Sequence, residues 1–183
     1  MERPEAYIIT FENEYVRIAQ VNLDADAPPS RYAAAALPMT RVILASDDPR
    51  MPRGSTHYCE TMPDDAGHSM REIRVELKSR LNSPPMKIDA VRVDPARYKI
   101  DFENDRVRVV RLGFGPRQKG MMVEHPPRVL VTLTDVAVKL AFAGGHTDER
   151  GAPAGVAGWL EGETLLTENA RDEALQVVLI EPK

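Results

Sequence analysis

The chain has 183 residues, of which 43% are hydrophobic and 28% charged, a composition typical of a folded protein rather than a disordered one. Its formal net charge of −4 disfavours a nucleic-acid-binding function, which normally needs a basic surface. Its apolar runs are too short to span a bilayer, and residues 1–6 lack the layout of a secretory signal. Cys59 is the single cysteine, which excludes an intramolecular disulfide. We therefore expect a cytoplasmic protein that binds neither nucleic acid nor membranes.

The first half of the chain is predicted to consist of β-strands. The motif FENEYVR at 11–17 leads into a segment that alternates between apolar and polar residues. A loop that contains Ala33–Ala36 follows, then a β-rich run that begins at Arg41 and a closing strand at 71–77. Short strands separated by Pro, Gly, Asp and Asn are typical of a β-sandwich or barrel.

A proline-containing linker separates this half from the next. Pro84, Pro85 and Pro95 predict an extended or turning segment rather than a long helix. We divide the chain into residues 1–93 and 94–183 at this linker, and we expect little helix in either half.

The second half repeats the order of the first. FENDRVR at 102–108 matches 11–17 at five of seven positions, and a β-rich run that begins at Arg128 follows. Similar segments in the same order indicate a duplication. The two copies of the motif are 91 residues apart, whereas Arg41 and Arg128 are 87 apart. This difference predicts about four extra loop residues in the first copy, with Ala33–Ala36 as the candidate.

The second half resembles a cupin, an RmlC-like jelly-roll barrel, and the first half resembles it more faintly. The resemblance rests on the order of several pieces: the Phe-Glu-Asn motif, the sequence EHPP at 124–127, Gly155 with Trp159, and Glu168-Asn169. It implies an all-β fold of two tandem cupin barrels (double-stranded β-helices), with a degenerate N-terminal copy. Because cupins often pair through their sheets, it also implies a homodimer. A jelly roll encloses a pocket between its two sheets.

The family commonly holds a metal with a His-x-His pair, a nearby Glu and a later His. If His125 is the second histidine of the pair, Val123 takes the place of the first, and the Glu position falls within 128–130, where there is no carboxylate. The later histidine position falls within 164–166, at Thr, Leu or Leu. One imidazole cannot supply the ligands that such a site needs. The resemblance therefore implies a degenerate site with no metal and no other cofactor.

The first copy retains even less of the family pattern. Its loop 30–38 contains no His, Cys, Asp or Glu, although Gly54 and Tyr58 match Gly155 and Trp159. We expect the structure to persist there without a site.

His125 is the one weak catalytic candidate, because an imidazole titrates near neutral pH and suits a general base. Glu161 or Glu163 would have to approach it from across the barrel. The alternative is a structural histidine bonded to a carbonyl near the Pro126-Pro127 bend. We expect a ligand pocket lined by Met122, Val123, His125, Trp159 and Leu165.

Alternation predicts that Val107 and Val109 point into the barrel, and that Arg106 and Arg108 lie on a charge-paired outer face. The preferred function is a metal-free degenerate bicupin that binds a small, moderately apolar organic molecule or has a structural role, without strong catalytic activity. The alternative is a cupin enzyme, either a metal-free isomerase or epimerase with His125 as base or a metal-dependent oxygenase-type cupin. A third possibility is an interaction module that pairs through its sheets.

Overall fold

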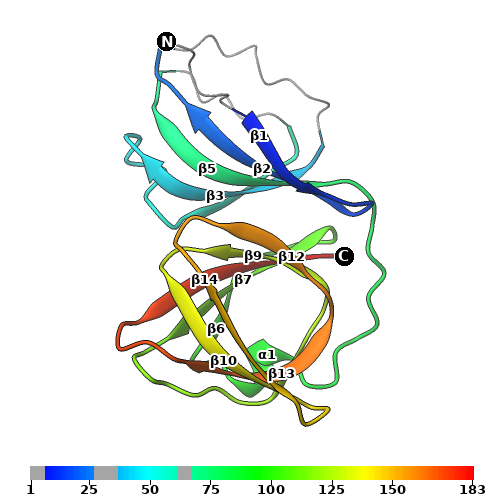
Figure 1. Ribbon diagram of the computed structural model, residues 1–183. Helices are drawn as coiled ribbons and strands as arrows, with labels where there is room; N and C mark the ends of the chain where they lie inside the picture. Colours follow the sequence, from blue (N-terminus) through cyan, green and yellow to red (C-terminus); the bar gives the residue numbers. More distant parts are fainter. Residues whose placement is uncertain (1–6, 27–36, 62–66) are drawn as a thin grey trace. The chain divides into compact units, whose positions relative to one another are not determined.

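The structure is a computed structural model that describes residues 7–26, 37–61 and 67–183 (Figure 1). It is 56% strand and 2% helix, which confirms the predicted all-β fold class. The chain forms two compact units, Met1–Arg80 and Leu81–Lys183. The second unit starts before residue 94 because the linker packs on it: Ala90 lies in its core, and the Ile88 carbonyl accepts a hydrogen bond from the Glu124 amide. In the described residues, no helix is long and apolar enough to cross a membrane.

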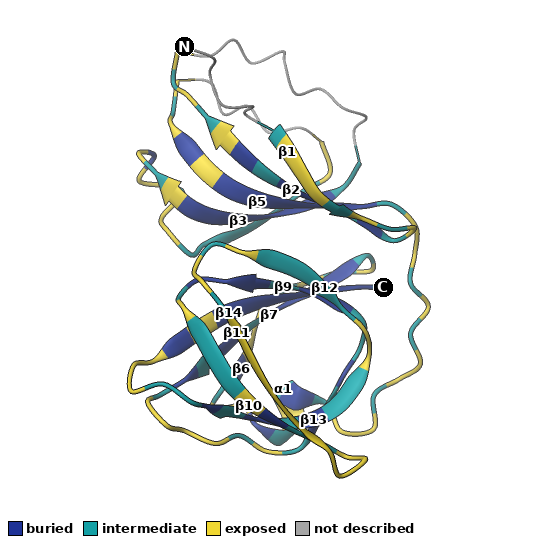
Figure 2. Ribbon diagram, viewed as in Figure 1, coloured by how far each residue is buried: buried dark blue, intermediate teal, exposed yellow. Residues whose placement is uncertain are grey.

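The first unit contains one antiparallel sheet of five strands, in the order β1-β2-β5-β3-β4. Most side chains of the three central strands are buried on both faces, as the dark blue ribbons of Figure 2 show. The strands are β1 (Tyr7–Glu12), β2 (Val16–Leu23), β3 (Met39–Ser46), β4 (Thr56–Cys59) and β5 (Met70–Leu77).

The second unit contains two antiparallel sheets. The five-stranded sheet has the order β12-β9-β14-β7-β6, and the four-stranded sheet has the order β11-β10-β13-β8. The larger sheet consists of β6 (Tyr98–Glu103), β7 (Val107–Phe114), β9 (Arg128–Thr132), β12 (Ala157–Leu160) and β14 (Leu175–Pro182). The smaller sheet consists of β8 (Val123–His125), β10 (Val136–Phe142), β11 (Thr147–Ala152) and β13 (Glu163–Asn169), and the short helix α1 spans Ala90–Val93.

The sheet of the first unit repeats the larger sheet of the second. Read from β6, the larger sheet runs β6-β7-β14-β9-β12, which is the order β1-β2-β5-β3-β4 with each strand replaced by its copy. Both sheets have a register irregularity in the first strand, between Ile9 and Phe11 and between Ile100 and Phe102. Within the described residues of the first unit, no strands correspond to the smaller sheet of the second. The first unit thus shows one half of a jelly roll.

Strand pairing gives the exact correspondence of the two copies. Thr40 pairs with Tyr58, and Val129 pairs with Trp159, so Thr40 corresponds to Val129, 89 residues further on. The two copies also share the turn that precedes β4 in the first unit and β12 in the second. The amide of Gly54 donates to the Ile43 carbonyl, and the amide of Gly155 donates to the Thr132 carbonyl. The two accepting residues, Ile43 and Thr132, are again 89 residues apart.

The sequence match of Arg41 with Arg128 is therefore displaced by two residues. Arg41 corresponds to Leu130, because both lie one position after the matched pair Thr40 and Val129. The similar Arg-Val pairs had suggested the wrong offset. The candidate insertion Ala33–Ala36 lies outside the described residues.

The face of β7 that lines the interior of the second unit is opposite to the predicted face. Val110, Leu112 and Phe114 belong to its core cluster, and Arg108 shares their face. The predicted orientation of Val107 and Val109 into the barrel is wrong, since both faces of β7 are largely buried and apolar alternation cannot tell them apart. Arg108 is 7% exposed rather than solvated.

Candidate functional site

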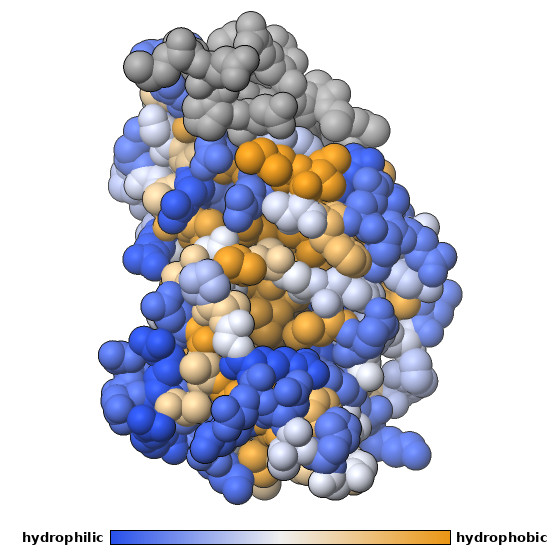
Figure 3. All heavy atoms as spheres, viewed as in Figure 1, coloured by the Kyte–Doolittle hydropathy of each residue, from blue (hydrophilic) through white to orange (hydrophobic). Residues whose placement is uncertain are grey.

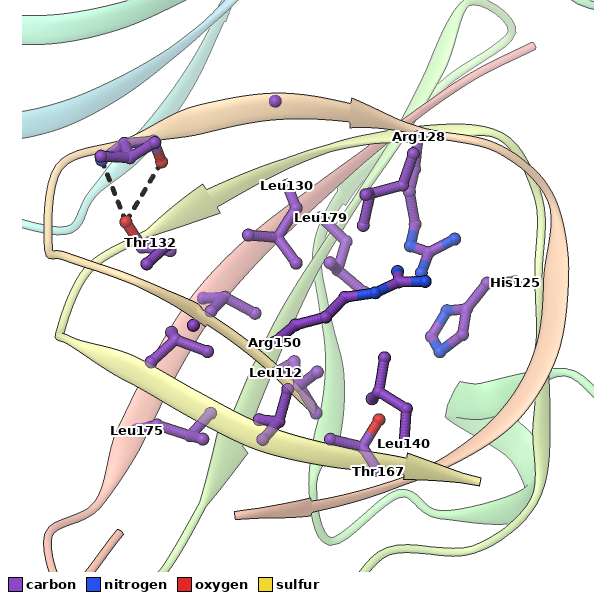
Figure 4. Close-up of a pocket in the computed structure, with 18 of the residues that line it drawn as sticks. Leu112, His125, Arg128, Leu130, Thr132, Leu140, Arg150, Thr167, Leu175 and Leu179 are labelled. Carbon is purple, nitrogen blue, oxygen red and sulfur yellow. Dashed lines mark hydrogen bonds between the residues drawn. The ribbon is translucent and has the colours of Figure 1, made fainter. Parts of the chain in front are cut away.

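A cavity of about 260 Å³ lies between the two sheets of the second unit (Figure 4). One wall comes from the larger sheet and the other from the smaller one. Most of its lining is aliphatic, and the hydrophobic atoms of the recessed region are visible in Figure 3. Its leucine lining includes Leu112, Leu130, Leu140, Leu165, Leu175 and Leu179.

One end of the cavity is polar. His125, Arg128, Arg150 and Glu163 line it there, and Figure 4 shows the two guanidiniums close to each other and to the imidazole. These residues come from different strands. Glu163 on β13 pairs in register with His125 on β8, which places a carboxylate beside the imidazole position.

Arg128 is the buried cation of this end. Its guanidinium donates to Glu163 Oε1 at 2.8 Å and to the carbonyls of Pro126 and Glu161 at 3.2 and 3.3 Å. Burial lowers the pKa of Arg128 and the Glu163 carboxylate opposes that shift, so the side chain stays charged. Its Nε has no hydrogen-bond partner among the residues that the structure describes.

His125 is held as a neutral imidazole. Burial, followed by the Arg128 charge, lowers its pKa well below the ordinary value of 6.5. Its Nε2 lies 3.4 Å from the Tyr98 hydroxyl, a contact at the long limit for a hydrogen bond. Its Nδ1 is buried and has no partner in the described part of the chain. Burial also raises the pKa of Tyr98, which keeps the phenol protonated.

Arg150 connects the cavity to solvent. It lines the cavity although 42% of its side chain is exposed. It lies on β11, an edge strand that Figure 2 shows as exposed. The cavity also reaches β12, the edge strand of the other sheet, where Ala157 and Gly158 provide little side-chain bulk. An added Cβ at Gly158 would meet no atom within 4 Å, so this part of the lining is open space.

A second buried charge lies beside the cavity, on β14. Glu181 is 5% exposed, and burial raises the pKa of its carboxyl to about 7, with Arg108 opposing the shift. Arg108 lies 3.8 Å from Glu181 and donates to Asp89 at 2.9 Å. This group supports the barrel and does not line the cavity.

Comparison with known proteins gives the fold. No protein-family model matches the sequence, and no curated protein matches it. A cupin 2 conserved barrel domain protein from Leptotrichia buccalis aligns over 100% of this chain and 92% of its own, with a TM-score of 0.53 and 11% identity. The chain has the fold of a cupin barrel protein.

Other solved cupins align with part of the chain. A cupin domain protein from Bordetella pertussis Tohama I covers 47% of this chain and 91% of its own length, with 25% identity and a TM-score of 0.44. An RmlC-like cupin protein from Desulfovibrio desulfuricans covers 54% of this chain and 95% of its own, with 18% identity and a TM-score of 0.33.

The cavity contains two of the residues expected there. His125 and Leu165 line it, and Leu165 is in register with Val123. Val123 is fully buried in the adjacent core cluster. Met122 precedes β8, is half-buried and does not line the cavity.

Trp159 lies away from the cavity, contrary to expectation. Its neighbours Gly158 and Leu160 line the cavity, whereas the Trp159 indole donates to Glu161 Oε1 at 2.7 Å. The large aromatic of the family pattern had suggested a pocket position, but its register with Val129 places it on the opposite face of the sheet.

Sequence reasoning missed Arg150. The segment 147–152 contains three charged residues and shows no apolar alternation, so nothing marked one side chain as inward-facing. Arg128 lies within 128–130, where the family pattern places a glutamate, and its side chain lines the cavity.

The residues present do not fit the metal site that the cupin family commonly has. Val123 and Leu165 face each other across β8 and β13 and have no donor atoms, and the charge of Arg128 acts on His125. In the described residues, no group of three or more His, Cys, Asp or Glu side chains is placed to hold a metal ion. Metal-free function remains a prediction.

At three positions of this cavity wall, the described part of the first unit has charged side chains in place of apolar ones. The register of β5 and β14 makes Glu72 equivalent to Val177 and Arg74 equivalent to Leu179, and Arg41 is equivalent to Leu130. Arg41, Glu72 and Arg74 are each at most 2% exposed, and Glu72 accepts hydrogen bonds from both arginines. Ion pairs thus take the place of aliphatic lining.

Proposed function

We propose that this cupin binds a small, largely apolar organic molecule in the cavity of its second unit, without a metal and without strong catalytic activity. The cavity carries the proposal: it is lined mainly by aliphatic side chains and has a few polar groups at one end, the composition of small-molecule sites in general. Its volume of about 260 Å³ is below the range of roughly 300–1,000 Å³ for drug-sized ligands, so the ligand is small.

The first unit is proposed to have no ligand site. Where the second unit has Leu130, Val177 and Leu179, the first has a buried cluster of two arginines and a glutamate. Charged side chains at these positions remove the apolar surface that an organic ligand needs. One ligand per chain is therefore expected.

Binding is favoured over turnover by the state of His125. A general base works best when its pKa is near the operating pH, and the pKa of His125 is far lower. Glu163, the nearest carboxylate in register, is bonded to Arg128, and the described residues provide His125 with no carboxylate partner. The metal-free isomerase alternative depends on such a partner. Homodimer formation and a cytoplasmic location stay predictions.

The test is calorimetric titration with 1-octanol, a small neutral molecule with an apolar chain. Gly158→Leu should fill open space in the cavity, because a Cβ there meets no atom within 4 Å and the glycine does not have a positive φ. We expect a weakening of at least tenfold, about 1.4 kcal/mol. Gly158→Ala, which adds one methyl group, is the matched control and should change the affinity by much less.

The result that would contradict the proposal is binding that Gly158→Leu leaves unchanged, or no binding of 1-octanol to the wild type. Circular dichroism of both variants checks that the strands remain. Chemical conversion of a bound molecule by the wild type, lost in His125→Ala, would favour the enzyme alternative.

A further inference from the structure

We propose that the molecule bound in this cavity carries a carboxylate, and that Arg150 is the residue that selects it. The inference rests on the proposed binding function and adds the chemical class of the ligand. It comes from charges and unpaired donors at the polar end of the cavity.

Two cations share one carboxylate at this end. Arg128, Arg150 and Glu163 are the charged side chains of the described lining. Glu163 Oε1 accepts from Arg128 at 2.8 Å, while its Oε2 is 3.8 Å from Arg150, beyond hydrogen-bond distance. Within the lining itself, positive charge therefore exceeds negative charge by one, while the carboxylates of Asp148 and Glu181 act on the two arginines from outside the lining.

Arg150 is oriented by contacts that leave its guanidinium in the cavity. Its Nε donates to Asp148 Oδ2 at 2.9 Å, and its guanidinium lies 5.5 Å from the centre of the Phe142 ring. Asp148 has 47% of its side chain exposed and does not line the cavity, so water screens this pair. Figure 4 shows the end of Arg150 directed toward Arg128 and His125.

Unpaired atoms lie deeper at the same end. Arg128 Nε–H can act only as a donor, and it has no acceptor among the described residues. His125 Nδ1 is also buried and unpaired within the described part of the chain. Buried polar groups in proteins normally have partners, so both atoms indicate a polar ligand group beside them.

A carboxylate matches this arrangement in charge and shape. Its single negative charge equals the excess positive charge of the lining, and its two oxygens suit the planar donors of a guanidinium. The aliphatic lining then receives the rest of the molecule. An amine would be repelled by Arg150, and an alcohol would offer the guanidiniums no charged acceptor inside the cavity. A phosphate dianion would carry one negative charge more than the excess positive charge of the lining.

The experiment compares ligands that share an octyl chain: octanoate, 1-octanol, octylamine and octyl phosphate, each titrated calorimetrically at pH 8. Wild type should bind octanoate at least tenfold more tightly than 1-octanol. Arg150→Gln should reduce that ratio below about threefold, because the variant loses much more affinity for octanoate than for 1-octanol. Arg150→Lys, which keeps the positive charge but removes the planar pair of guanidinium donors, should give an intermediate ratio.

Lys139→Gln is the matched control. Lys139 lies on the neighbouring strand β10 between Val138 and Leu140, which line the cavity, and it pairs with Glu149 outside it. The variant removes one positive charge from the same hairpin and should keep the wild-type preference for octanoate.

Equal binding of octanoate and 1-octanol by the wild type would overturn the inference and leave the proposed function standing. Tighter binding of octyl phosphate or octylamine would replace the carboxylate by another class. An octanoate preference that survives in Arg150→Gln would overturn the role of Arg150. Absence of binding by all four compounds would instead count against the proposed function itself.

Discussion

Replacing Glu72 with glutamine removes the negative charge that Arg41 and Arg74 share inside the first unit. Glu72 Oε2 accepts from Arg41 Nε at 2.7 Å, and its Oε1 accepts from Arg74 Nε. The Glu72 and Arg41 side chains are 0% exposed and that of Arg74 is 2% exposed, so water does not replace the lost charge. Glutamine has nearly the same shape, and the change is one of charge.

The expected loss of stability is large. Removing one partner of a buried ion pair costs about 3–5 kcal/mol, because the remaining charge loses a counter-charge in a site that water does not reach. A domain of 60–100 residues loses about 4–8 °C in Tm per kcal/mol, so the Tm of the first unit should fall by at least about 12 °C. The variant Arg41→Leu/Glu72→Val/Arg74→Leu copies the residues of the second unit. It should be neutral or stabilised by about 1–4 kcal/mol, because apolar replacements avoid the desolvation of charge.

The two units can be followed separately. Trp159 is the single tryptophan and lies in the second unit, so its fluorescence reports the unfolding of that unit, whereas far-UV circular dichroism reports both. In urea, Glu72→Gln should shift a circular-dichroism transition that tryptophan fluorescence does not show. Glu14→Gln, at an exposed position of the same unit, is the control and should stay within about 0.5 kcal/mol of wild type. A loss below about 1 kcal/mol in Glu72→Gln would refute the reasoning that this ionic cluster is desolvated.

Three further predictions concern the second unit. The pKa of Glu181 is raised to about 7 from 4.5, so between these pH values the folded protein retains a proton that the unfolded chain releases. The free energy of unfolding is therefore highest below about pH 4.5 and falls as the pH rises to about 7, by about 3 kcal/mol in total. Glu181→Gln, measured against wild type in urea between pH 5 and 8, should remove this decline, and parallel pH profiles would contradict it. Arg128→Met should cost about 3 kcal/mol by leaving Glu163 without its closest cation, and adding Glu163→Leu should recover most of that loss; equal stability of the single and double variants would speak against the pairing. Untagged protein grown with added Zn, Mn and Fe should contain no stoichiometric metal by elemental analysis, and one metal per chain that disappears in His125→Ala would restore the metalloenzyme alternative.

The duplication was visible in the sequence because the repeated motif forms a specific turn. The side chain of Asn13 accepts hydrogen bonds from the amides of Tyr15 and Val16, and Asn104 does the same for Arg106 and Val107. The Glu of each motif accepts from a lysine at the end of the closing strand, Lys78 or Lys183. A turn that depends on particular side chains leaves a recognisable motif, and from it the strand order and the cupin resemblance could be predicted.

The candidate site was less predictable, for physical reasons. Arg108 was placed outside the barrel because Val107 and Val109 alternate with it, yet both faces of β7 are largely buried. Trp159 was placed inside because it belongs to the family pattern, whereas strand register decides its face. Arg150 comes from an edge strand with polar residues on both faces, and such a strand carries no periodic signal. His125 could be found because it stands at a position that the family pattern names.

The most direct test of the central claim is to locate a bound ligand on the protein. Titrating 1-octanol into protein with labelled Leu and Val methyl groups, and recording methyl NMR spectra, reports each methyl separately. We predict that Leu130 and Leu179, which line the cavity, shift in proportion to occupancy, and that Val42 and Val75 of the first unit do not. Shifts confined to the first unit, or no saturable shift at Leu130 and Leu179, would contradict a ligand site in the barrel of the second unit.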